Sequence, residues 1–311
     1  MWSDLLREKE GESTSRILQE LEMVDWASPL LQRISERGGV TSDNMPLLFE
    51  ARFAYELFRR GLRVQYEYPA GVEDSTIEFR IEDSREWLVE LVSIRKSEGV
   101  RKATKKDGDS FHMVLSSLNL KKGTRDETKQ SEEAEMITAQ HKIGEKVLAG
   151  IRPTKFPCPR SSMHAILVGM RGYIGAGGDW IDYRQIAYGP DGVPANRQAL
   201  IHYWEERPIR GLFEKIKNHP ARAAGLLQER IHLLGFVAEK DCAENENANR
   251  AYWLPNPHLV TAVMQVEIQK TFPPCERYTY HPHSPDGPKR CFWLHSRLRH
   301  SGRSCCRALA Q

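Results

Sequence analysis

Two glutamates, Glu78 and Glu90, have the type and spacing to do chemistry together. They lie equally far from Ser84 in the polar turn EDSRE, and each falls in a stretch with the character of a β-strand. If the stretches pair as an antiparallel hairpin centred on Ser84, the two glutamates lie opposite one another, with Cβ atoms about 4.5 to 5.5 Å apart. The spacing therefore predicts a close pair of carboxylates on one face of a sheet.

Such a pair needs compensation for its charge. Like charges placed opposite one another destabilise a sheet, and the apolar run WLVELVSI around Glu90 adds a desolvation cost. A divalent cation or a raised pKa would remove the repulsion. Mg²⁺ or Mn²⁺ held by carboxylates, with substrate phosphate among the other ligands, suits phosphodiester cleavage. The alternative is an off-register hairpin, in which Glu78 is exposed at an edge and Glu90 pairs with a buried arginine.

Helices and strands that could position these acids follow from the hydrophobic pattern. Residues 1–36 predict one or two amphipathic helices, and a further helix begins after Thr41 or Ser42 and ends near Arg60, before Gly61. Three strands follow, at about Leu62 to Tyr68, Thr76 to Ile81 and Trp87 to Ile94. The third is apolar almost throughout, as expected of a central strand.

The second half of the chain is less regular. Residues 96–130 predict a long mobile polar excursion, followed by a helix from about Ser131 to Leu148 and a buried strand from Met163 to Met170. Gln140 lies on the apolar stripe of that helix, so it is expected to face the sheet. The later elements predicted are two helices, Arg207 to Lys217 and Pro220 to Arg230, and a strand, Ile231 to Ala238.

The order of these elements resembles the PD-(D/E)XK nuclease superfamily. The resemblance covers about residues 43–170 and rests on FEARFAYEL, STIEFRI and EWLVELVSI. It implies an α/β fold with a restriction-endonuclease-like core, made of a helix, a three-strand antiparallel meander, a helix and a strand, with additional C-terminal helices and a strand. It further implies an endonuclease of bacterial defence or of mobile elements, with Glu50, Glu78 and Glu90 as ligands of Mg²⁺ or Mn²⁺.

Two departures from the family pattern bear on activity. Glu78 stands where the family usually has Asp, and Val92 stands where the motif lysine is expected. The helix EEAEMITAQHKIGEK offers Lys142 and Lys146, with Gln140 as an inward polar group, and Gln140 and Lys142 are the catalytic candidates besides Glu78 and Glu90. On an ideal helix Lys142 lies about 200° from Gln140, so both cannot readily face one site. If no cation replaces the lysine, the alternative is an inactive restriction-like fold that binds nucleic acid or protein.

Glu50 has no partner for an ion pair within its own helix, because Pro46, Leu47, Phe53 and Ala54 are its neighbours three and four residues away. Those neighbours favour burial, which a carboxylate tolerates only with a partner such as a metal. A solvated helix glutamate is the alternative.

Basic residues outside the core are candidates for contact with nucleic acid. Lys102, Lys105 and Lys106 lie in the polar excursion, where they form either a phosphate-contacting arm or a solvated loop, and Arg171 lies in the glycine-rich stretch GMRGYIGAGG. The Cys and His residues of the tail match no zinc-finger spacing. His164, His232 and His258 lie in or beside apolar runs and are predicted to be core histidines. Nucleic acid, DNA rather than RNA, is the expected partner, and a homodimer is left open.

Composition sets the remaining expectations. The charge of +3 and pI near 8.5 permit nucleic-acid binding without requiring it, and the six scattered cysteines are not a disulfide framework. No apolar run approaches a membrane span, and the charged N-terminus is unlike a secretory signal, so the sequence predicts a cytoplasmic protein. The predicted divisions are an N-terminal helical segment (1–40), a nuclease-like core (41–175), a C-terminal α/β extension packed on the core (176–272) and a disordered basic tail (273–311).

Overall fold

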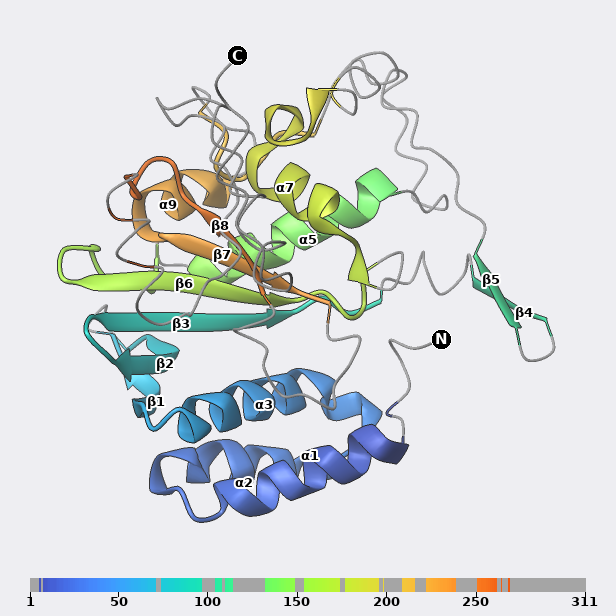
Figure 1. Cartoon of the computed structure of the whole chain (residues 1–311), viewed down its shortest axis with the longest axis vertical. Coiled ribbons are helices and arrows are strands. Elements are labelled where there is room, and N and C mark those ends of the chain that lie inside the picture. Colours follow the sequence, from blue (N-terminus) through green and yellow to red (C-terminus); the bar gives the residue numbers. More distant parts are fainter. Residues whose placement is uncertain are drawn as a thin grey trace, which may run out of the picture.

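A six-stranded mixed sheet with helices on both faces forms the centre of the protein in the computed structural model (Figure 1). The order of its strands is β1-β2-β3-β6-β7-β8. The α/β class predicted from the sequence is therefore confirmed. The structure describes residues 6, 8–70, 74–96, 104–107, 110–113, 132–148, 154–173, 177–195, 198, 209–215, 222–238, 251–261, 264 and 268. Across these ranges, no helix is long and apolar enough to cross a membrane.

The first three strands form the predicted antiparallel meander. They are β1 (Arg63–Pro69), β2 (Thr76–Glu82) and β3 (Glu86–Ser93). In β2 and β3, Ile81 lies opposite Trp87 and Phe79 opposite Val89, which is the register centred on Ser84. Buried and more exposed side chains alternate along β2, whereas the inner residues of β3 are all buried. This difference makes β3 a central strand covered on both faces.

The other half of the sheet begins with two parallel strands. β6 (Ser162–Gly169) runs parallel to β3, β7 (Leu233–Val237) runs parallel to β6, and β8 (Tyr252–Pro255) closes the sheet antiparallel to β7. The strand predicted at 231–238 thus extends the same sheet that carries the two glutamates. β8 was not predicted from the sequence, because it has four residues and is too short to show a clear period.

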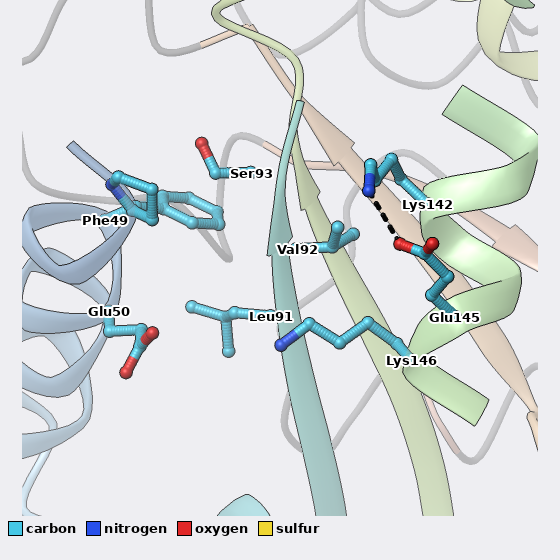
Figure 2. A pocket seen from close by; sticks show the side chains of 9 residues that line it. Phe49, Glu50, Leu91, Val92, Ser93, Lys142, Glu145 and Lys146 are labelled. Atoms are coloured by element: carbon cyan, nitrogen blue, oxygen red, sulfur yellow. Dashed lines mark hydrogen bonds and ion pairs between the residues drawn. The ribbon is translucent and has the colours of Figure 1, made fainter. Parts of the chain in front are cut away.

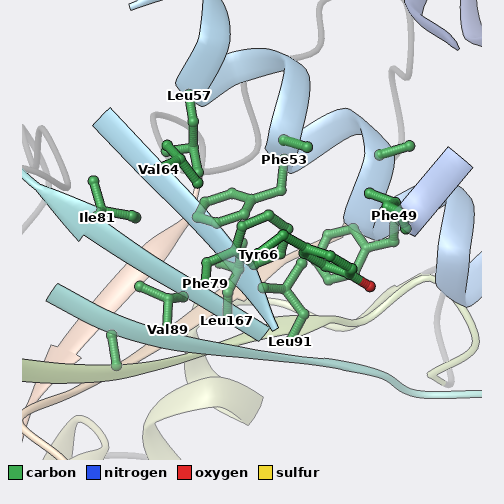
Figure 3. Close-up of a cluster of buried hydrophobic side chains, with 14 of the residues drawn as sticks. Phe49, Phe53, Leu57, Val64, Tyr66, Phe79, Ile81, Val89, Leu91 and Leu167 are labelled. Atoms are coloured by element: carbon green, nitrogen blue, oxygen red, sulfur yellow. The ribbon is translucent and has the colours of Figure 1, made fainter. Parts of the chain in front are cut away.

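One face of the sheet is covered by the N-terminal helices α1 (Glu8–Leu21), α2 (Ser28–Glu36) and α3 (Met45–Arg59). Their boundaries agree with those predicted, within a few residues. Short 3₁₀ turns, Asp25–Ala27 and Ser42–Asn44, precede α2 and α3. Figure 3 shows the aromatic and aliphatic side chains that join α3 to β1, β2 and β3, among them Phe53, Tyr66 and Phe79. Phe79 meets Phe53 and Tyr66 edge to face, with ring centroids 5.1 Å apart in each pair. These contacts fix α3 over the carboxylate-bearing hairpin.

The opposite face carries α5 (Glu132–Val147), α7 (Trp180–Tyr188) and α9 (Arg222–Arg230), with the 3₁₀ turn Pro190–Gly192 after α7. Helix α7 was not predicted, although the sequence holds a signal for its start: Asp179 and Asp182 form a capping box. The prediction of a helix at 207–217 is wrong for its described part, because residues 209–215 contain only turn and coil. There the backbone amides of Leu212 and Phe213 donate to carbonyls of α7 instead of to their own turn.

The polar excursion after β3 contains regular structure in the part that is described. β4 (Thr104–Asp107) pairs antiparallel with β5 (Ser110–Met113), and Asp107 lies opposite Ser110. The two residues between the strands are Gly108 and Asp109. Because a Gly-Asp pair between strands is a hairpin signal, the sequence did hold an indication of this element. The remainder of 97–130 and the whole 273–311 tail lie outside the described residues.

Two predicted core histidines pack against one another across β6 and the residue before β7. His164 and His232 are buried, and the backbone amide of His164 donates to Nδ1 of His232 at 3.0 Å. Nδ1 of His164 lies 2.7 Å from the carbonyl oxygen of Arg230, and its Nε2 lies 2.8 Å from the Ser162 hydroxyl. If Nδ1 donates to that carbonyl, Nε2 accepts from Ser162, so a neutral ring satisfies every partner.

Acid is therefore expected to destabilise the protein through this pair. Burial lowers the pKa of His164 to about 4; burial, with His164 next to it, lowers the pKa of His232 to about 3. The unfolded chain binds these protons near pH 6.5, so the stability that they contribute is full above 6.5 and is lost as the pH falls toward the folded values. Between pH 7 and 5 the contribution of each histidine to the free energy of unfolding should fall by roughly 2 kcal/mol, and urea unfolding measures it as the difference in slope between wild type and a histidine variant. His232→Gln should flatten this slope and exposed His141→Gln should not; equal slopes in all three proteins would contradict the prediction.

Candidate functional site

The strands β2 and β3 separate at Glu78 and Glu90. Their paired residues end at Phe79 and Val89, although β2 continues beside β1 to Thr76, which lies opposite Pro69. Where the strands separate, the two carboxylates accept backbone hydrogen bonds in place of the carbonyls of a ladder. The Glu78 amide donates to Glu90 Oε1 at 3.1 Å, and the Leu91 amide donates to Glu78 Oε2 at 2.5 Å. We call this place the fork. The predicted juxtaposition of the two acids is confirmed, and the off-register alternative is wrong.

Two lysines meet the acids of the fork. Lys146 of α5 places Nζ 2.5 Å from Glu78 Oε1 and 3.4 Å from Glu90 Oε2. Lys155, which follows α5, places Nζ 2.6 Å from Glu90 Oε1. Burial lowers the pKa of Lys146, but Glu78 and then Glu90 outweigh it, so that the pKa is raised overall. Glu90 therefore pairs with lysines, not with the buried arginine of the alternative considered above.

Glu50 of α3 is buried, as its apolar neighbours predicted, and its partners come from other elements. The Tyr66 hydroxyl of β1 donates to Glu50 Oε2 at 2.7 Å, and Arg33 of α2 lies 3.8 Å from the same oxygen. Arg33 also donates to Tyr66 at 2.5 Å and to Glu67 at 2.9 Å. The solvated alternative for Glu50 is thus wrong, and a cation reaches this acid from the N-terminal helices.

The backbone is strained beside this group. Glu67 has φ 50, in the left-handed region that a residue other than glycine rarely adopts. It lies in β1 between Tyr66 and Tyr68, whose partners Phe79 and Ile77 flank Glu78. Such strain costs about 1 to 3 kcal/mol and tends to be retained near functional sites.

Two acids of the cluster have raised pKa values, because burial and a neighbouring carboxylate outweigh the nearby cations. Burial, followed by the charge of Glu78, raises the pKa of Glu90 to about 7, against the lowering effect of Lys155 and Lys146. The same two causes raise the pKa of Glu50 to about 8, although Tyr66 and Arg33 oppose them. Both acids therefore hold protons at pH values where an exposed glutamate is fully ionised.

The other candidates lie elsewhere. Gln140 donates to the carbonyls of Ile186 and Arg210, at 3.1 and 2.7 Å, so its stripe of α5 faces the unpredicted α7 and not the acids. Lys142 pairs with Glu145 on its own helix at 2.8 Å. Arg171 is buried and bonds both carboxylate oxygens of Glu10, so it is not exposed to a phosphate as the glycine-rich loop suggested. Lys105 and Lys106 lie in β4 with side chains that are not described, and Lys102 lies outside the described residues.

Val92, at the position of the motif lysine, belongs to the core on the α5 side of the sheet. The ammonium comes from α5 instead, because Lys146 reaches across to both acids. The sequence analysis named Lys146 as one of two lysines that could serve. It did not identify Lys155, Tyr66 or Arg33, whose contacts with the acids join distant parts of the chain.

A pocket of about 230 Å³ adjoins the fork. Figure 2 shows its walls: Phe49 and Glu50 of α3 on one side, Lys142, Glu145 and Lys146 of α5 on the other, and Leu91, Val92 and Ser93 of β3 between them. Pro46 completes the α3 wall. Glu50 and Lys146 thus belong both to the acid cluster and to the pocket.

The donor set suits a hard divalent cation, although it is not assembled around one. In the part of the chain that the structure describes, no three His, Cys, Asp or Glu side chains form a group that could hold a metal ion. The strongest sign of a missing partner is Glu90 Oε2, a buried oxygen to which no described residue donates a hydrogen bond and which has the Lys146 ammonium 3.4 Å away. A buried carboxylate oxygen left so is unusual, and oxygen is the ligand that Mg²⁺ prefers.

Comparisons of the chain with protein-family models, with curated proteins and with solved structures found no match.

Proposed function

We propose that the protein is a metal-dependent nuclease that hydrolyses phosphodiester bonds of nucleic acid. The observation that carries the proposal is the fork, where buried Glu90 and partly buried Glu78, from adjacent strands, meet one lysine that contacts both. The order of α3, the meander, α5 and β6 around the fork is also that of the PD-(D/E)XK superfamily, which the sequence resembles. A cytoplasmic location, DNA rather than RNA as substrate and a homodimer stay predictions.

Glu78 and Glu90 would hold Mg²⁺ or Mn²⁺, with Glu50 as a third ligand. The two fork acids fit a cation although the three acids do not form a metal-binding group: among the described residues, Glu90 Oε2 lacks a hydrogen-bond donor and Glu78 Oε1 is held by Lys146, an ammonium that a competing cation can displace. A bound divalent cation would polarise the phosphoryl group and lower the pKa of an attacking water.

The residues around the fork have separate tasks. Lys155 and the Glu78 amide fix Glu90 Oε1, whereas Oε2 has the Lys146 ammonium 3.4 Å away. Tyr66 and Arg33 fix Glu50 from the other side of the cluster. Lys146, once released from Glu78, can offer its ammonium to a phosphate oxygen and so stabilise the negative charge that develops in the transition state. Preorganised groups of this kind are what phosphodiester hydrolysis needs.

The inactive binding module was the alternative because Val92 replaces the motif lysine. That reason is weakened, since Lys146 brings an ammonium to both acids from another element. The experiment is to incubate purified protein with labelled single-stranded and duplex oligonucleotides, with Mg²⁺, with Mn²⁺ or with EDTA. Cleavage that needs the metal supports the nuclease, whereas salt-dependent binding without any cleavage would support the module.

The affinity for a divalent cation is expected to rise with pH. Burial and Glu78 raise the pKa of Glu90 to about 7 and that of Glu50 to about 8, and a metal must displace these protons. The protons on Glu90 and Glu50 stabilise the metal-free fold, fully below pH 4.5, and this stabilisation is lost as the pH rises through 7 and 8. The stabilisation by a bound metal therefore grows over the same pH range. Mn²⁺ titrations at pH 6 and 8 should differ by about tenfold or more. Equal affinities would contradict these proton positions.

A further inference from the structure

The pocket beside the fork exists because β2 leaves β3. Beyond Glu90, β3 keeps β6 on one side, where Leu91 lies opposite Leu167 and Ser93 opposite Gly169. On the other side its pairing with β2 has already ended at Val89. In the part of the chain that the structure describes, no strand therefore pairs with this edge of β3 along Leu91, Val92 and Ser93, and these residues line the pocket between α3 and α5.

The two walls of the pocket differ in chemistry. Lys142 and Lys146 project from the α5 wall beside Glu145, and Phe49 lies on the α3 wall beside Glu50 (Figure 2). Pro46 also lines the pocket, so that Pro46 and Phe49 give the α3 wall an apolar surface. A nucleotide has the same division, with an anionic phosphate at one end and an apolar face on its base. Glu50 and Lys146 connect this pocket to the acid cluster.

The lysine wall can accept an anion at little cost. Lys142 pairs with Glu145 at 2.8 Å, but the two side chains are 50% and 46% exposed, and an exposed pair of this kind is worth about 0 to 1 kcal/mol. A phosphate can therefore replace Glu145 as the partner of Lys142.

The size of the pocket restricts what enters. About 230 Å³ is below the roughly 300 to 1,000 Å³ of pockets for drug-sized ligands, so it suits one nucleotide unit or part of one. A base that is stacked and paired in a duplex reaches such a pocket only after it has left the stack, which costs a few kcal/mol and is cheapest in a strand that is already single.

We propose that this pocket binds one unpaired nucleotide next to the bond that is cut, with its phosphate at Lys142 and Lys146 and its base or sugar against Phe49 and Pro46. The inference rests on the proposed function, and it makes single strands, frayed ends and flaps the preferred substrates.

The direct test measures binding without turnover. Thymidine 5′-monophosphate is titrated in EDTA, by NMR, into the full chain and two variants. Ser93→Phe fills the pocket, and Ser84→Phe makes the same change at the exposed hairpin turn. We expect binding to wild type and to Ser84→Phe, and at least tenfold weaker binding to Ser93→Phe. Binding that is absent from wild type, or equal in all three proteins, would overturn the proposal.

A second variant and a cleavage assay test the proposal separately, so that misfolding of Ser93→Phe or a lack of cleavage does not decide the outcome. Lys142→Glu changes an exposed position, should fold, and is expected to weaken mononucleotide binding at least tenfold; unchanged binding would overturn the phosphate assignment. With Mg²⁺, a single strand should be cut at least tenfold faster than the same sequence inside a duplex, and a duplex preference would overturn the substrate class. If the mononucleotide binds as expected and nothing is cut, the subsite stands and the nuclease proposal fails.

Discussion

Glu90→Gln is expected to lose cleavage by more than about 100-fold while it unfolds close to the wild-type temperature. Activity falls because an amide is a poor ligand for Mg²⁺ and carries no charge to offset that of the cation. Stability is kept because the pKa of Glu90 is raised to about 7 by burial and by Glu78, so the folded protein already accommodates a nearly neutral side chain there. A glutamine oxygen can still accept from the Glu78 amide.

The measurement is initial cleavage rate alongside thermal unfolding for wild type, Glu90→Gln and Glu82→Gln. Glu82 is an exposed glutamate at the end of β2 that pairs with Arg80, and its change should leave both quantities unaltered. Full activity in a Glu90→Gln preparation free of wild-type enzyme would remove Glu90 from the mechanism.

Lys146→Met is the second change with a large expected effect, a loss of about 10²- to 10³-fold in cleavage rate. It keeps the length of the side chain but removes the ammonium that contacts both acids. Stability should also fall, because Glu78 and Glu90 then face each other without the ammonium that contacts both, while Lys155 contacts Glu90 alone among the described pairs. Breaking a buried pair costs about 3 to 5 kcal/mol, and since Lys146 is 28% exposed we expect roughly 1 to 3 kcal/mol.

Added Mn²⁺ should restore part of that stability, since a divalent cation also compensates the two acids. Kinetics and chemical unfolding of Lys146→Met are compared with those of Lys9→Met, a change of the same kind at an exposed position of α1. Wild-type cleavage by Lys146→Met would show that α5 does not replace the missing motif lysine.

The hairpin and its acids could be predicted because their geometry is local. The period-two pattern of β2 and a short turn centred on Ser84 fix the register, and the register brings Glu78 next to Glu90 although the ladder ends one pair earlier, at Phe79 and Val89. The burial of Glu50 could be predicted as well, from apolar neighbours within one turn of helix. These inferences need only a few neighbouring residues.

The partners of the acids could not be predicted, because they depend on how distant elements pack. Lys146 and Lys142 are one turn apart on α5, and only the placement of that helix over β3 decides that Lys146 reaches the fork. Gln140 was expected to face the sheet because α7, which takes its side chain, had not been recognised. Arg171 in a glycine-rich segment suggested a free phosphate ligand, and its burial against Glu10 depends on the position of α1.

The replacement of the motif lysine also has a physical reading. Val92 packs in the α5-side core, so a lysine there would have to bury its stem among apolar neighbours to reach the acids. The longer path from α5 lets Lys146 keep part of its side chain in solvent, which lowers the cost of burying a charge.

The central claim is that the fork holds a divalent cation between Glu78 and Glu90. The most direct measurement is a calorimetric titration of Mn²⁺ into wild type, Glu78→Gln, Glu90→Gln and the control Glu82→Gln at pH 8, where Mn²⁺ is expected to compete best with protons. We predict one site in wild type and in Glu82→Gln, weakened at least about tenfold in each of the two fork variants. Unchanged affinity in both fork variants would contradict the account.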